Sequence, residues 1–117
     1  MIIEITKGEG RYQVRLQAGN MGSDLVVRIF NAGAHIGAVA LGEYDFEHER
    51  ASVSMITRLG HKDDAIAQKA AYLISKSTKK AVCVIAGVHL DNIKIEEIGQ
   101  LQENALQSIE EFIKSLA

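Results

Sequence analysis

Hydrophobic and polar positions alternate along the first half of the chain, with a period of two that predicts β-strands. Between residues 12 and 17, for example, Tyr12, Val14 and Leu16 share one side and polar residues share the other. Five segments are predicted to be strands in this way: residues 3–6, 12–17, 25–30, 35–42 and 51–57. Glycine, asparagine or many charged residues fill the predicted turns and loops between them: residues 7–10, 19–22, 31–33 and 43–50.

The second half of the chain changes to a helical period, in which Ile66, Ala70 and Ile74 recur on one side. Three further elements are predicted there: a helix over residues 62–78, a fully apolar strand over 81–87 and a helix over 93–116. Five strands, a helix, a strand and a helix predict an α+β fold. We expect a mostly antiparallel six-stranded β-sheet with two helices, formed as a single domain by residues 1–117.

Composition narrows the classes of function. The 117 residues are 47% hydrophobic and 24% charged, which is typical of a folded globular protein. The net charge of −2 gives no sign of the basic face that nucleic-acid binding needs. No apolar run approaches the ~20 residues of a membrane span. A lone cysteine, Cys83, and the lack of a visible signal peptide lead us to expect a cytoplasmic protein.

The usual signatures of an enzyme are missing from the sequence. The close histidine–acid pairs at 61–63 and 89–91 do not form a recognisable set of metal ligands. Ser54 lies on a predicted strand, but no nucleophile-elbow glycines surround it. We therefore predict a protein that is not an enzyme. General acid–base chemistry by His35 or His89 stays open, because histidine titrates near neutrality.

A β-α-β unit is predicted in the middle of the chain, formed by the strand at 51–57, the helix after it and the strand at 81–87. If both strands lie in one sheet, the crossover makes them parallel, and their carboxyl ends share one edge. Gly60-His61-Lys62 follows the first strand, and the segment from Gly87 to Asn92 follows the second. Both segments are therefore expected at the same edge of the sheet.

The strand predicted at 35–42 brings a third histidine to this edge if it runs antiparallel to the strand at 51–57. It then begins at the shared edge, and it begins with His35. We therefore expect three of the four histidines, His35, His61 and His89, to converge on one rim. In sheets with parallel strands, ligands tend to bind beyond the carboxyl ends of those strands.

Such a rim favours an anionic ligand, because helix N-termini present free N–H groups and a positive dipole end. Gly37, Gly60 and Gly87 would let the backbone approach a ligand closely. Purely structural roles are the alternative: residues 60–64 as a plain helix start, His35 as a strand-edge residue, and Asp91-Asn92 as a helix N-cap. His48, in the polar connection, is expected to be solvated.

Four segments of the chain resemble a known family in their order and spacing. They are His35-Ile36-Gly37-Ala38-Val39-Ala40, Ser52-Val53-Ser54, Gly60-His61-Lys62-Asp63-Asp64 and Ala86-Gly87-Val88-His89-Leu90-Asp91-Asn92-Ile93. Together they resemble the prenylated flavin chaperones, small proteins that accompany UbiD-type aromatic decarboxylases and are similar in fold to proteasome assembly chaperones. The resemblance covers about residues 34–115.

The resemblance implies a homodimer that binds prenylated FMN, or FMN, and stores it or delivers it to a decarboxylase. Transferred by position, the implied cofactor-binding residues are His35, Gly37, Ser54, Gly60, His61, Lys62, Gly87, His89, Asp91 and Asn92. Lys62 and the amides near His61 would hold the phosphate, and His35 and His89 would contact the ring or the ribityl chain. Leu90 stands where the family commonly has tyrosine, which puts an aromatic contact there in doubt.

Two other functions remain open at this point. The chain would be a protein-interaction or assembly chaperone module without cofactor if the rim histidines are structural. It would be a catalytic subunit acting on hydroxyaromatic acids if the isolated protein were active. Flavin titration separates the first of these from the cofactor carrier, and an activity assay separates the second.

Overall fold

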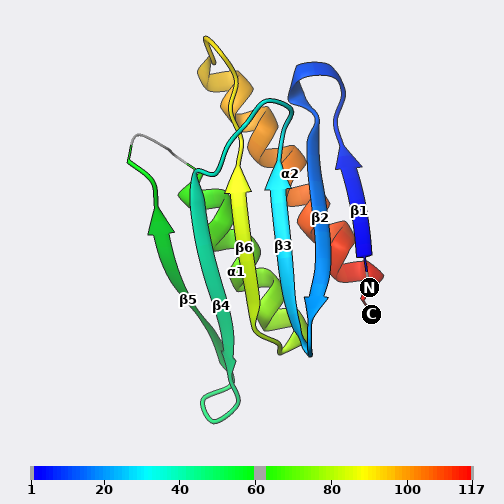
Figure 1. Ribbon diagram of the computed structural model, residues 1–117, viewed down its shortest axis with the longest axis vertical. Coiled ribbons are helices and arrows are strands. Elements are labelled where there is room, and N and C mark those ends of the chain that lie inside the picture. The colour runs from blue at the N-terminus through cyan, green and yellow to red at the C-terminus, as the bar shows by residue number, and fades with distance from the viewer. Residues whose placement is uncertain (1, 60–62, 117) are drawn as a thin grey trace.

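The computed structural model describes residues 2–59 and 63–116, which form a six-stranded sheet with two long helices on one of its faces (Figure 1). The strands are β1 (Ile2–Lys7), β2 (Val14–Met21), β3 (Asp24–Phe30), β4 (Ala38–Asp45), β5 (Arg50–Thr57) and β6 (Val82–Gly87). The helices are α1 (Asp64–Thr78) and α2 (Ile95–Ser115), and a short 3-10 helix, η1 (Gly10–Tyr12), follows β1. The predicted α+β fold class is confirmed.

The strand order is β1-β2-β3-β6-β4-β5, and only the pairing of β3 with β6 is parallel. Because β4 lies between β5 and β6 and is antiparallel to both, β5 and β6 run in the same direction. The predicted crossover from β5 to β6 is therefore confirmed. In the sheet, β4 lies between the two strands that the crossover joins. The carboxyl ends of β3, β5 and β6 and the start of β4 share the upper edge in Figure 1.

Some predicted boundaries are wrong. Strand β2 continues to Met21, through three residues that were predicted to be a turn, and the chain reverses only at Gly22, whose φ is 61°. Strand β4 begins at Ala38 rather than residue 35 and runs on to Asp45. The end of β4 carries polar residues and pairs with β5 in a hairpin at the opposite end of the sheet from the rim (Figure 1). The local pattern of polar residues therefore predicts a loop at residues 43–45, where the structure has a strand.

The hydrophobic core lies between the sheet and the helices. Leu16, Val27 and Val84 point into it from three neighbouring strands and are fully buried. Helix α1 packs over β4, β5 and β6, and α2 packs over β1 and β2. A Cβ at Gly42 of β4 would lie 2.5 Å from the backbone oxygen of Ala71, so this glycine lets α1 approach the sheet closely.

The other face of the sheet carries no helix within the described residues (Figure 1). Alternate residues of β3, β6, β4 and β5 point to this open face, and many of them are apolar and at least partly exposed. They include Val26 and Phe30 of β3, Val39 and Leu41 of β4, Ile56 of β5, and Cys83 and Ile85 of β6. Neither helix in the described part of the chain is long and apolar enough to cross a membrane.

Candidate functional site

His35 and His89 meet at the upper edge of the sheet. His35 lies in the loop before β4, and His89 lies two residues after β6. Their ring centroids are 6.1 Å apart, the rings are tilted by 57°, and both residues are exposed. The predicted convergence of these two histidines is confirmed. Gly60, His61 and Lys62 lie outside the described residues, and their part in the site stays a prediction.

Two of the glycines that are predicted to bind a ligand, Gly37 and Gly87, pack tightly against other residues of this chain. A Cβ at Gly87 would overlap the backbone oxygen of His35, and a Cβ at Gly37 would overlap the carboxylate of Asp63. The loop before β4 can cross the end of β6 only because Gly87 has no side chain. Both glycines are therefore required by the fold of the rim. Their contact with a ligand stays a prediction.

Asn31 holds the His89 segment in place, whereas the sequence pattern marks it only as a turn residue. Its side-chain Nδ2 donates to the backbone oxygen of His89 at 2.6 Å, and its Oδ1 accepts from the backbone N–H of His89 at 2.9 Å. Asn31 is only 4% exposed. A buried amide with both ends paired fixes the segment on which a site histidine is carried.

Asp63 holds the residue before His89. Its Oδ1 accepts a hydrogen bond of 3.0 Å from the backbone N–H of Val88, and the side chain is 5% exposed. Asp63 occupies the N-cap position of α1, but its side chain makes no capping hydrogen bond. Asp64, in the first turn of α1, is placed to complement the helix dipole.

Asp91 is placed to orient His89. Its Oδ1 lies 3.2 Å from Nε2 of His89, and its backbone oxygen accepts a hydrogen bond of 3.1 Å from Nη2 of Arg11. Arg11 also pairs with Glu97 of α2 at 3.2 Å from its Nε. The 3-10 helix after β1 thus anchors the segment after β6.

The alternative in which Asp91-Asn92 caps the last helix is wrong. Helix α2 begins at Ile95, and its N-cap is Lys94, whose N–H donates to Oε1 of Glu97 at 3.0 Å. Asn92 instead adopts a φ of 54° and lies exposed in the connecting segment. Its predicted contact with a ligand stays a prediction.

Ser54 is not brought to the histidine pair. It lies within β5, opposite Leu41 of β4 and three residues before the strand ends at Thr57. With about 3.3 Å per residue, this places it roughly 10 Å below the rim. A serine at the middle of an exposed strand face has no geometric link to His35 or His89.

A small hollow adjoins His35 on the open face of the sheet. Its volume is about 140 Å³. Its lining residues come from β3, β6 and the loop that joins β3 to β4: Arg28, Ile29, Phe30, Ala34, His35, Ile36, Ile85 and Gly87. A larger groove of about 320 Å³ lies between α1 and α2, on the helix layer behind the sheet, and includes none of the rim residues described above.

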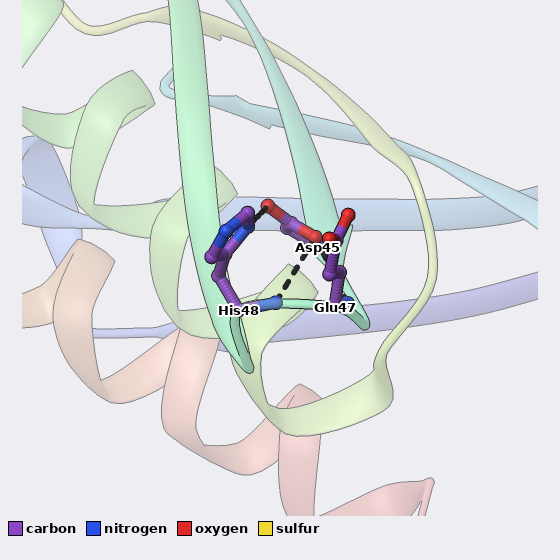
Figure 2. Close-up of side chains that lie close together, drawn as sticks. All are labelled: Asp45, Glu47 and His48. Atoms are coloured by element: carbon purple, nitrogen blue, oxygen red, sulfur yellow. Dashed lines mark hydrogen bonds and ion pairs between the residues drawn. The ribbon is translucent and has the colours of Figure 1, made fainter.

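His48 lies at the other end of the molecule, in the turn between β4 and β5, where it was expected to be solvated (Figure 2). It is 59% exposed, but its Nδ1 lies 2.8 Å from Oδ2 of Asp45. The other Asp45 oxygen accepts from the backbone N–H groups of Glu47 and His48. The hydrogen bond with the His48 side chain lowers the pKa of Asp45, and the backbone N–H of His48 adds to this effect. These contacts stabilise the turn.

Comparison with known proteins identifies a family and a fold. The family profile described as a prenylated flavin chaperone LpdD-like domain matches residues 8–117. The fold is similar to a chain in the crystal structure of a novel chaperone complex for yeast 20S proteasome assembly, with a TM-score of 0.64 and 16% identity over 99% of this chain and 94% of that chain. No curated protein matches the sequence. The predicted likeness in fold to proteasome assembly chaperones is confirmed.

Proposed function

The chain belongs to the prenylated flavin chaperone LpdD-like family, and on this premise we propose that it is a non-catalytic carrier of prenylated FMN. It binds the cofactor, stores it in the cytoplasm and delivers it to a UbiD-type decarboxylase. The family match, which begins at residue 8, includes most of the first thirty residues, in which the sequence alone shows no familiar motif.

The pair formed by His35 and His89 is the observation that carries this proposal. Each imidazole can donate and accept hydrogen bonds, and both rings are exposed at the rim where strands β3, β5 and β6 end. Ile36 and Phe30 add apolar surface beside His35. A flavin combines a planar ring with polar edge atoms, so these residues fit its chemistry.

The chain's own contribution is binding and orientation. When bound, the prenylated flavin supplies the ring chemistry that the decarboxylase uses. Asn31 and Asp63 hold the backbone at residues 88–89, and Asp91 orients the His89 ring. Interactions that hold the rim in one arrangement before the ligand arrives lower the entropic cost of binding.

We further propose that two copies pack through their open sheet faces. This face exposes contiguous apolar side chains on β4, β5 and β6, and burying an apolar sheet face against another element is favourable. Leu41 is 44% exposed and Ile56 is 74% exposed. The hollow beside His35 opens on the same face, so a second copy would supply a wall for the cofactor. A two-fold arrangement uses the same patch on both subunits.

Titration of the purified protein with prenylated FMN, under anaerobic conditions, tests the carrier function. Binding should shift the visible spectrum of the flavin, and His89→Ala should weaken binding at least tenfold. Loaded protein should then activate a UbiD-type apo-decarboxylase in the absence of free cofactor. His48→Ala removes a histidine from the far end of the sheet and should bind flavin like the parent. If the parent and His89→Ala bind flavin equally well, the assignment of the flavin site to this rim is wrong.

A protein-interaction module without cofactor is the second candidate. It is supported by the fold similarity to a chain from a proteasome assembly chaperone complex, at an identity that shows the fold alone. In that case flavin titration shows no spectral change, and His89→Ala lowers the free energy of unfolding instead of the affinity for flavin. The same pair of measurements therefore separates the two functions.

A further inference from the structure

Arg28 is an exposed cation on the sheet face that carries no helix in the described part of the chain. It lies in the middle of β3, an interior strand, on the open face of the sheet. Its neighbours across the two adjacent strands are Gln17 of β2 and Ile85 of β6. Within residues 2–59 and 63–116, no carboxylate forms an ion pair with it. The guanidinium is therefore a cation without an anionic partner in the described part of the chain.

Phe30 holds this cation over the hollow. The guanidinium carbon of Arg28 lies 5.0 Å from the centroid of the Phe30 ring, two residues along the same face of β3. Stacking on an aromatic ring attracts the cation and restricts its rotamers. The planar guanidinium keeps its N–H groups free for an anion, which it can bind with two parallel hydrogen bonds.

The size of the hollow limits what can enter it. Its volume of about 140 Å³ is well below the ~300 Å³ at which pockets begin to enclose whole ligands. It can therefore take one group of a larger ligand. Its walls are apolar at Phe30, Ile36 and Ile85, and Arg28 supplies the cation.

His35 connects the hollow to the rim. It lines the hollow and also faces His89, with the two ring centroids 6.1 Å apart. A ligand that contacts the histidine pair can thus extend one end past His35 onto the open face of the sheet. The group that matches a small hollow with an arginine is the anionic end of that ligand.

We infer that the hollow binds the phosphate group of the flavin nucleotide, with Arg28 as the cation that recognises it. This inference rests on the proposed carrier function and adds to it the residue that distinguishes a nucleotide from an unphosphorylated flavin. It differs from the sequence-based prediction, which assigned the phosphate to Lys62 and the start of the first helix.

The test compares FMN with riboflavin, which has the same ring system and ribityl chain but no phosphate. Dissociation constants for both are measured by fluorescence titration for the parent, Arg28→Gln, Arg28→Lys and Lys62→Ala. Arg50→Gln is the matched control, because it removes an exposed arginine from the end of β5 that is far from the rim. Prenylated FMN is titrated in parallel by its visible spectrum, and thermal melts verify folding.

We expect Arg28→Gln to weaken FMN binding at least tenfold and to change riboflavin binding less than twofold. Arg28→Lys, which keeps the charge but loses the planar fork, should be intermediate. The inference is overturned if the parent binds FMN and riboflavin equally, or if Lys62→Ala alone removes the preference for FMN. It is also overturned if Arg28→Gln changes self-association but leaves the preference for FMN over riboflavin intact. A parent that binds neither FMN nor prenylated FMN overturns the carrier function as well.

Discussion

The side-chain amide of Asn31 exchanges two hydrogen bonds with the backbone of His89, a residue 58 positions further along the chain. Asn31 follows β3 and His89 follows β6, the one parallel pair of strands in the sheet. The amide therefore extends the pairing of these strands beyond their last residues, Phe30 and Gly87, and ties together the two segments from which the rim is built.

Replacing Asn31 by alanine should destabilise the protein and weaken flavin binding together. The change leaves the N–H and C=O groups of His89 without their protein partner, at a cost of about 1–3 kcal/mol in the free energy of unfolding. Urea denaturation and flavin titration measure the two effects. Asn20→Ala, at an exposed position on β2, should change neither. An Asn31→Ala protein with the parent's flavin affinity would show that the position of His89 does not matter for binding.

Gly87→Ala should displace the loop that carries His35. The new Cβ would overlap the backbone oxygen of His35, so the loop has to move, at a cost of about 1–3 kcal/mol in the free energy of unfolding. We expect a loss of flavin affinity and changed NMR shifts for His35. Gly99→Ala is the control, because its Cβ meets no atom within 4 Å and lies in α2. It should stabilise the protein by up to about 1 kcal/mol, since alanine favours helix.

The turn between β4 and β5 should show its own pH dependence. The pKa of Asp45 is lowered below its ordinary value of 3.8, chiefly by the hydrogen bond with His48. The ionised carboxylate therefore stabilises the folded state at pH values above 3.8, and this contribution is lost as the pH falls below 3.8 through the folded-state pKa. In an NMR titration, His48→Ala should raise the pKa of Asp45 toward 3.8. An unchanged pKa in that variant would contradict the role given to His48.

Charged substitutions on the open face should dissociate the proposed homodimer. Leu41→Glu places a carboxylate at the centre of this face, where a second copy would have to bury it, and burying an unpaired charge is costly. Leu41 is already 44% exposed, so the fold should tolerate the change. Sedimentation velocity should show a dimer for the parent and for Gln68→Glu, on the helix layer, and a monomer for Leu41→Glu. A parent that sediments as a monomer at micromolar concentration would contradict the dimer.

Much of this architecture follows from local patterning. A period of two marks most of the strands, because side chains alternate between the faces of a sheet, and a period of 3.6 marks α1 and α2. The helical crossover of the β-α-β unit then predicts that β5 and β6 run in the same direction. These rules are sufficient to predict that His35 and His89 lie at one edge of the sheet. They depend only on the order of residues in the chain and on the chirality that all L-amino acids share.

Other features came only from contacts between distant segments. Asn31 and Asp63 look like an ordinary turn residue and an ordinary helix start, and their roles are visible only because β3 lies beside β6 and α1 begins next to Val88. The hollow at Arg28 likewise requires the loop before β4 to cross Gly87. The partner of a side chain depends on which segments pack together. That packing is determined by the burial of the entire hydrophobic core. Residue order alone therefore places His35 and His89 at one edge of the sheet, while the packing of the chain decides which residues hold them there.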